Sequence, residues 1–281
     1  MTYTLRNAWS VMRQTVQSVF VTLVLSCLPV VVIAAVDLQE DTREQFERYA
    51  ARATEAFLKR VRAEAGTSTD DASSTQPRAL RDGAVLGRAG GEDGIINVSD
   101  GLVHHWFATT FIEGVTLKDA LDVSYAYEDY QAFYKPIVSS RLIAQNGNTY
   151  RALLRLRESA GGMTAVLDVT TRVEYFHPDA NTAYSISTAE DIREVKDAGG
   201  SGERHLPAGH DSGYLWRAVT LSRLVQRESG VLIEMETLGL SRSFPPFLGW
   251  IIEPIARRIG RKSAELSVQE FRTAVRARAQ R

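Results

Sequence analysis

The feature that most constrains this fold is an alternation of apolar and polar residues in the middle of the chain. Between Met163 and Tyr175, nearly every second residue is apolar or aromatic, and most residues between them are polar or charged. Thr149–Arg157 repeats the pattern, with Tyr150, Ala152, Leu154 and Leu156 on its apolar side. Because successive side chains of a strand point to opposite faces, this period of two indicates an antiparallel sheet with one buried and one wet face.

Eight segments from residue 95 onward have the composition of short strands separated by turns. The turns are rich in Gly, Asn, Asp and Ser, as at Asn146–Asn148 and Glu228–Gly230. A helix is predicted among them over Leu117–Tyr134, with Thr116 as its N-cap. The series predicts an α+β fold. The predicted strands are residues 95–98, 102–112, 137–145, 149–157, 163–175, 182–192, 213–226 and 231–241.

A second helix is predicted to close the fold, from Pro246 to about Arg278. Pro254 and Gly260 should break or kink it. Each isoleucine on the apolar face of this helix contributes about 1.5–3 kcal/mol of stabilising free energy when it is fully buried. We therefore expect Pro246–Ile259 to contribute most to the core and to wall a ligand site, packed on the strand face that carries residues such as Leu154, Leu167, Val169 and Ile233. Its apolar stripe consists of Leu248, Ile251, Ile252, Ile255 and Ile259, continued by Leu266, Phe271 and Val275.

The N-terminal 35 residues have the pattern of an export signal. Arg6 and Arg13 precede the apolar run Val19–Ala35, and no acidic residue occurs before Asp37. The run is shorter than the ~20 residues that span a bilayer comfortably. Residues 1–35 are therefore predicted to be a secretory signal peptide, which implies a periplasmic or secreted protein. The alternative is an uncleaved segment that anchors the protein in the membrane.

Two further segments precede the predicted sheet. Residues 36–66 are expected to form an amphipathic helix, whose apolar face must dock on the following domain or on a partner. Residues 67–92, rich in Gly, Ser, Thr and Asp, are interpreted as a flexible linker, and 93–281 as the main domain. The apolar face of the helix consists of Phe46, Tyr49, Ala50, Ala53, Phe57 and Val61.

Composition and charge exclude several classes of function. The formal net charge is −1, so no global field favours nucleic acid. The single cysteine, Cys27, lies in the predicted signal peptide, so the mature chain has no thiol for a disulfide or a metal. Residues 254–281 contain eight Arg and Lys against two Glu. These basic residues either form a solvated helix face or contact an anionic membrane surface.

Four strings add a family resemblance. Val103–Phe107, Gly213–Arg217, Leu240–Arg242 and above all Leu248–Pro254 resemble the START-type (SRPBCC) helix-grip superfamily, which includes polyketide-cyclase-like proteins. They look like a subgroup of bacterial proteins with signal peptides. The resemblance covers roughly residues 93–270. It implies a helix-grip fold, in which a curved antiparallel sheet wraps a long C-terminal helix and a ligand lies between them. The family shares no catalytic motif, so no catalytic residue is carried over.

Given that fold, the core face and the cavity wall are the same surface. Arg217 and Glu253 are charged residues in apolar surroundings, which either pair with each other or orient a ligand headgroup. No cofactor is expected. The predicted cavity lining is Trp106, Tyr150, Leu154, Leu167, Val169, Tyr184, Trp216, Arg217, Ile233, Trp250, Glu253 and Ile255.

The histidines do not predict a metal site. His104 and His105 are neighbours on a strand, so their rings point to opposite faces and cannot chelate one ion together. His205, His210 and Asp211 share a loop, but their spacing is not specific for a metal.

The function predicted is non-enzymatic binding or transport of an apolar small molecule or lipid in the cell envelope. One alternative is a cyclase- or hydrolase-like enzyme that uses the same cavity through two convergent titratable groups. The other is a protein-interaction module that acts through the N-terminal helix or the basic C-terminus.

Overall fold

The computed structural model describes residues 37–64, 80, 84–160, 163–207, 210–243 and 246–281, all within one compact unit, Ala35–Arg281. For residues 246–259 only the backbone is described. The predicted signal peptide and most of the predicted linker lie outside the described residues. Within the described part, no helix is both long and apolar enough to cross a membrane.

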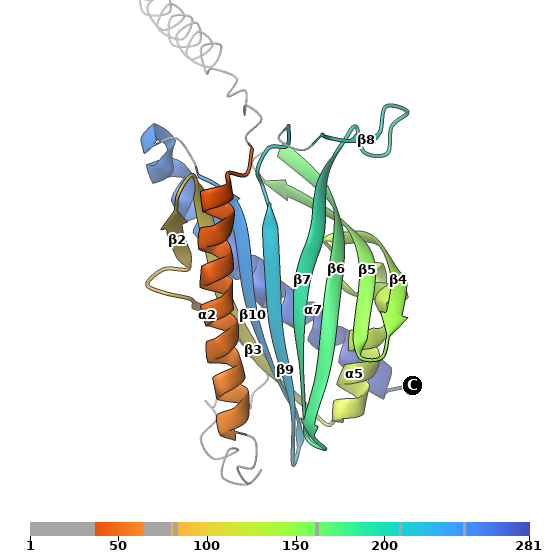
Figure 1. The fold of residues 1–281 in the computed structure, drawn as a ribbon. Coiled ribbons are helices and arrows are strands. Elements are labelled where there is room, and N and C mark those ends of the chain that lie inside the picture. The colour runs from red at the N-terminus through yellow and green to blue at the C-terminus, as the bar shows by residue number, and fades with distance from the viewer. Residues whose placement is uncertain (1–36, 65–79, 81–83, 161–162, 208–209, 244–245) are drawn as a thin grey trace, which may run out of the picture. The chain divides into compact units, whose positions relative to one another are not determined.

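Ten strands of the described chain form one long antiparallel sheet (Figure 1). The main strand order is β1-β3-β10-β9-β7-β6-β5-β4, with β2 paired to β3 and β8 to β7. All eight predicted segments are strands. The strands are β1 (Val85–Ala89), β2 (Ile95–Val98), β3 (Gly101–Glu113), β4 (Ile137–Asn146), β5 (Thr149–Ala160), β6 (Met163–Asp179), β7 (Thr182–Lys196), β8 (Arg204–His205), β9 (Arg217–Arg227) and β10 (Gly230–Arg242).

Strand β1 corrects part of the linker prediction, because it occupies the C-terminal end of residues 67–92. It pairs along its whole length with β3, from Val85 opposite Thr110 to Ala89 opposite Trp106. Its five residues are half-buried and exposed in turn. So short an edge strand, with a glycine at its centre, gives almost no periodic signal in the sequence.

The helices are α2 (Glu40–Glu64), α5 (Leu117–Tyr125), the 3-10 turn η1 (Tyr127–Asp129), α6 (Tyr130–Phe133) and α7 (Pro246–Ala279). A capping box starts α5: the hydroxyl of Thr116 accepts from the Asp119 amide, and the Asp119 carboxylate accepts from the Thr116 amide. The N-cap prediction is confirmed. The predicted single helix over Leu117–Tyr134 is wrong in its second half, where the chain turns at Ala126 and continues as η1 and α6.

Helix α7 packs on the concave face of the sheet. It is one continuous helix from Pro246 to Ala279, so the predicted breaks at Pro254 and Gly260 are wrong. Gly260 instead permits close contact: a Cβ there would lie 2.4 Å from Trp106 Nε1. The described side chains through which α7 enters the core are Ala264, Val268, Phe271, Ala274 and Val275. Those of Pro246–Ile259, predicted to contribute most to the core, lie outside the described residues.

Helix α2 covers the opposite, outer face of the sheet (Figure 1). Its stripe of Phe46, Ala50, Ala53, Phe57 and Val61 is buried against Val103, Trp216, Leu221, Leu238 and Leu240. A polar chain fixes the contact: the Tyr49 hydroxyl lies 2.9 Å from His105 Nδ1, and His105 Nε2 lies 2.8 Å from the carboxylate of Glu236. Arg60 of α2 pairs with the same carboxylate. The stripe therefore docks on its own domain.

This docking makes α2 a part of the folded core. Phe57→Ala removes a ring that is 4% exposed, so it should lower the free energy of unfolding by about 3 kcal/mol. Glu55→Ala, on the exposed side of the same helix, is the matched control and should change it by less than about 0.5 kcal/mol. Urea unfolding of the two variants decides the matter. If Phe57→Ala behaves like the control, α2 does not belong to the cooperative core.

Candidate ligand-binding site

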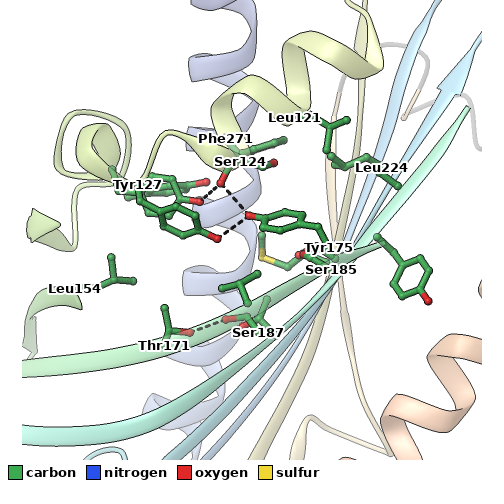
Figure 2. A pocket seen from close by; sticks show the side chains of 18 of the residues that line it. Leu121, Ser124, Tyr127, Leu154, Thr171, Tyr175, Ser185, Ser187, Leu224 and Phe271 are labelled. Carbon is green, nitrogen blue, oxygen red and sulfur yellow. Dashed lines mark hydrogen bonds between the residues drawn. The ribbon is translucent and has the colours of Figure 1, made fainter. Parts of the chain in front are cut away.

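A cavity of about 260 Å³ lies on the concave side of the sheet, beneath α5, η1, α6 and the C-terminal half of α7 (Figure 2). Its floor comes from β5, β6, β7, β9 and β10. Its roof is formed by Leu121 and Ser124 of α5, the tyrosines of η1 and α6, and Phe271 of α7. The sheet and the closing helices therefore enclose the space from opposite sides.

Small residues at the centre of the sheet leave this space open. On β7 the residues that face the cavity are Ala183, Ser185, Ser187 and Ala189, which are consecutive members of one strand face. The facing residues of β9 are Ala218, Thr220, Ser222 and Leu224. Ser185 lies opposite Ser222 and Ser187 opposite Thr220 in the strand register. Large β-branched side chains at these positions would fill the volume.

Tyrosine hydroxyls from the helical segment and from β6 meet at one side of the cavity and form a polar group there. The Tyr127 and Tyr175 hydroxyl oxygens lie 2.8 Å apart, and Tyr175 donates to the Ser124 carbonyl at 2.9 Å (Figure 2). Tyr130 donates to the same carbonyl at 2.6 Å. Burial raises the pKa of Tyr127, Tyr130, Tyr134 and Tyr175 above the ordinary tyrosine value. These hydroxyls therefore stay protonated at neutral pH.

The described lining carries no formal charge. It consists of apolar residues, serines, threonines and tyrosines, with no Asp, Glu, Lys, Arg or His among them. A carboxylate, phosphate or ammonium group inside the cavity would lose its hydration without meeting an opposite charge. The cavity is thus suited to uncharged molecules.

A second cavity, of about 350 Å³, lies on the outer face beside α2. Five charged residues line it, and four of them form ion pairs: Arg60 with Glu236, and Arg223 with Glu234. The fifth, Arg88, lies over the ring of Phe107. The first pair ties α2 to β10, and the second joins β9 to β10. We therefore place the candidate site on the concave face.

The structure places four of the predicted lining residues at the cavity: Leu154, Val169, Tyr184 and Ile233. Tyr184 borders the cavity, but its ring lies on the outer face of β7 and packs against Phe57 of α2, 6.0 Å between centroids, so the prediction that this side chain lines the cavity is wrong. The side chains of three others, Trp250, Glu253 and Ile255, lie outside the described residues, and so does the predicted pair of Glu253 with Arg217.

The remaining five predicted residues do not line the cavity. Trp106 is buried beneath α7 with Ala264 and Val268. Tyr150 stacks on Tyr125, with 5.3 Å between centroids, in a neighbouring tyrosine cluster. Leu167 is half-buried beyond the cavity lining.

Trp216 and Arg217 correct the prediction most clearly. Trp216 precedes β9 by one residue, so the strand alternation does not fix its side, and its indole is buried under α2. Its N–H donates to Asp211 Oδ1 at 3.0 Å. Arg217 is the first residue of β9 and lies on the outer face of the sheet, the same face as Leu221. Its guanidinium donates to the Trp216 carbonyl at 2.8 Å.

Sequence reasoning missed the tyrosines of the helical segment and the hydroxyl residues of β7 and β9. The alternation Ala183-Ser185-Ser187-Ala189 was a usable signal, because four small residues on one strand face leave room there. Tyr127, Tyr130 and Tyr134 gave no such signal, since the chain turn at Ala126 that aims them inward was not predicted.

The histidines lie apart from the cavity. His104 Nε2 contacts the Ser241 hydroxyl at 2.8 Å, whereas His105 bonds to Glu236 on the outer face. His205 bonds to Asp168 at 2.7 Å, and Asp211 accepts from Trp216. Across the described residues, no group of three or more His, Cys, Asp or Glu is placed to hold a metal ion.

Comparison with known proteins gives similarity in fold only. No family model matches the sequence, and no curated protein matches it. A STAR-related lipid transfer protein of Xanthomonas axonopodis is 14% identical, with a TM-score of 0.44 over 69% of this chain and 99% of that chain. Human STARD10 is 13% identical, with a TM-score of 0.40 over 66% and 75%. The Zhui aromatase/cyclase of a Streptomyces species is 12% identical, with a TM-score of 0.38 over 64% and 94%.

The arrangement of the elements themselves decides the architecture. One long antiparallel sheet carries a 34-residue C-terminal helix on its concave face, with a cavity between them. The fold is a START-type helix-grip fold. Helix α2 lies on the outer face and so stands outside this pair of sheet and C-terminal helix.

Burial of His104 generates a prediction about acid stability. Burial lowers the pKa of His104 to about 4, below the ordinary value of about 6.5. Between these two values the unfolded chain binds the proton and the folded chain does not, so stability falls as the pH falls. From pH 7 to pH 5 the wild type should lose about 2 kcal/mol more than His104→Gln, which cannot titrate. Urea unfolding at several pH values measures this difference, and parallel curves for the two proteins would contradict it.

Proposed function

We propose that the protein binds a small, uncharged and mainly apolar molecule in the concave-face cavity, and that it acts as a carrier rather than an enzyme. The observation that supports the proposal is the described lining, which is polar in places but without formal charge. A buried ion would need a compensating charge that these residues do not supply.

The size of the cavity supports a compact ligand. Its volume of about 260 Å³ is less than twice that of the roughly 150 Å³ apolar cavity that holds a benzene molecule. It lies just below the range of about 300–1,000 Å³ for pockets that take drug-sized ligands. A molecule of about two fused rings fits this space, whereas a whole diacyl lipid exceeds it.

Two other classes of function have less support. A cyclase or hydrolase needs a convergent acid and base, and the described lining offers only tyrosines that burial keeps protonated. An interaction module that acts through α2 needs a free apolar stripe, and that stripe is buried against the sheet. Both observations favour a carrier.

The cell envelope is the proposed location. The apolar run Val19–Ala35 supports export, as the sequence pattern predicts. On α7, the exposed side chains of Arg261 and Lys262 lie near the middle of the helix and those of Arg276 and Arg278 in its last turn, so positive charge is spread along its C-terminal half. Two of these are partly neutralised, Arg261 by Glu265 and Arg278 by Asp122. We propose contact of this half of α7 with anionic lipid headgroups.

Filling the cavity should abolish binding without unfolding the protein. Ser187→Phe places a ring in the cavity, whereas Thr188→Phe places the same ring on the exposed opposite face of β7. Naphthalene serves as a neutral two-ring probe, and its affinity is measured by calorimetry. Ser187→Phe should weaken binding at least about tenfold, and Thr188→Phe should leave it within about twofold. Equal binding by both variants, or no binding by the wild type, would contradict the proposed function.

A further inference from the structure

Ser124, Tyr127, Tyr130 and Tyr175 form a hydrogen-bonded group, here called the tyrosine wall, and its bonding pattern limits what a ligand can present there. A carbonyl oxygen only accepts, so Tyr175 and Tyr130 each commit their single proton to the Ser124 carbonyl. Tyr127 must then be the donor in its contact with Tyr175. The Ser124 hydroxyl commits its own proton to the Ala120 carbonyl at 3.0 Å. Every hydroxyl proton in this group is therefore in use.

These hydroxyl oxygens can therefore still accept hydrogen bonds but cannot donate any. The lone pairs of Tyr127 and Tyr130 can bond only to a group that brings its own proton, such as an alcohol, a phenol or an N–H. A carboxylate, an ether or an isolated carbonyl has no proton to give. At this wall such an acceptor would face only lone pairs and gain no hydrogen bond.

The floor of the cavity presents a second polar area. Ser185, Ser187, Thr220 and Ser222 form a block of two cross-strand pairs on β7 and β9. Ser187 bonds to Thr171, with 2.8 Å between their oxygens, and Thr171 also donates to the Thr188 carbonyl. For the side chains of Ser185, Thr220 and Ser222, no hydrogen bond to a described protein group occurs.

Such an array is unusual for the inner face of a central sheet, where apolar residues dominate. The side chains of this array are half-buried, so their hydroxyls remain able to bond to molecules inside the cavity. A ligand with oxygens along one edge would supply hydrogen-bond partners for them. Elsewhere the wall is apolar, as at Leu121, Leu154 and Phe271. The cavity thus combines hydrogen-bonding areas with apolar surface for a ring.

We infer that the ligand is a neutral, hydroxylated ring compound, whose hydroxyl donates to the tyrosine wall and whose polar edge lies on the β7–β9 hydroxyl block. This inference rests on the proposed function, since it assigns the chemistry of the molecule that the same cavity binds. It separates this ligand class from hydrocarbons, from fatty acids and from phospholipids.

The test uses four probes of one size class against the full-length protein by calorimetry. Naphthalene has no polar group, 2-naphthol adds a donor, 2-methoxynaphthalene keeps the oxygen without its proton, and 2-naphthoate adds a charge. We expect 2-naphthol to bind at least about tenfold more tightly than naphthalene. The methyl ether can accept from the floor hydroxyls but cannot donate to the tyrosine wall, so it should bind more weakly than 2-naphthol, and 2-naphthoate should bind more weakly than naphthalene.

The variant pair Ser185→Ala with Ser222→Ala removes two floor hydroxyls and leaves the cavity size nearly unchanged. A dihydroxynaphthalene should lose its advantage over 2-naphthol in this double variant, because only its contact with the floor is removed, while the affinity for naphthalene itself stays within about twofold. Thr188→Ala, on the exposed face of β7, is the control and should preserve the advantage.

The outcomes separate the two proposals. If naphthalene, the methyl ether and 2-naphthol bind equally well, the inference about hydroxyl groups is overturned and the carrier function stands. If 2-naphthoate binds most tightly, the uncharged class of ligand is wrong. If none of the probes binds, the proposed function itself fails.

Discussion

The structure depends on the need to cover both faces of one long antiparallel sheet. Leu221 and Leu238 point to the outer face, whereas Leu224 and Ile233 point to the concave face, so neither face can remain in water. Helix α2 covers the outer face, and α7 with α5 covers the concave one. The polar chain from Tyr49 through His105 to Glu236 fixes the position of α2. Because α2 packs closely on the outer face, part of the concave face can hold a cavity instead of a filled core.

The cavity follows from a contrast in side-chain size between neighbouring parts of that face. Near α7, Trp106 and Ile112 fill the space between sheet and helix, and Gly260 lets the helix backbone approach the indole. Farther along the face, Ser185 and Ser222 are too small to reach the roof. The tyrosines of η1 and α6 close that part from above. The close packing at Trp106 and Ile112 therefore sets the distance between α7 and the sheet. At Ser185 and Ser222 the same distance is not filled by side chains, and the cavity results.

The sequence predicted what local periodicity determines. The strands and the cap at Thr116 followed from alternation and turn chemistry, and the helix-grip fold followed from the element order and the family resemblance. The site could be predicted only in part. Leu154, Val169 and Ile233 lie on regular strands, where alternation assigns the face. Trp216 lies outside that alternation, and Tyr127 depends on a turn set by tertiary packing. A cavity is harder to predict from the sequence than the face of a strand residue. It depends on which side chains of different elements leave space between them in the folded protein.

The most direct test of the account is native mass spectrometry of the protein, purified under mild conditions from the cells that produce it. The account predicts a bound neutral molecule of a few hundred daltons, which is released on denaturation and whose fragments show hydroxyl groups. Ser187→Phe, purified in the same way, should carry none of it. A diacyl phospholipid or a fatty acid in its place, or an adduct that Ser187→Phe retains, would contradict the central claim that the cavity, whose described lining carries no formal charge, selects a neutral ligand.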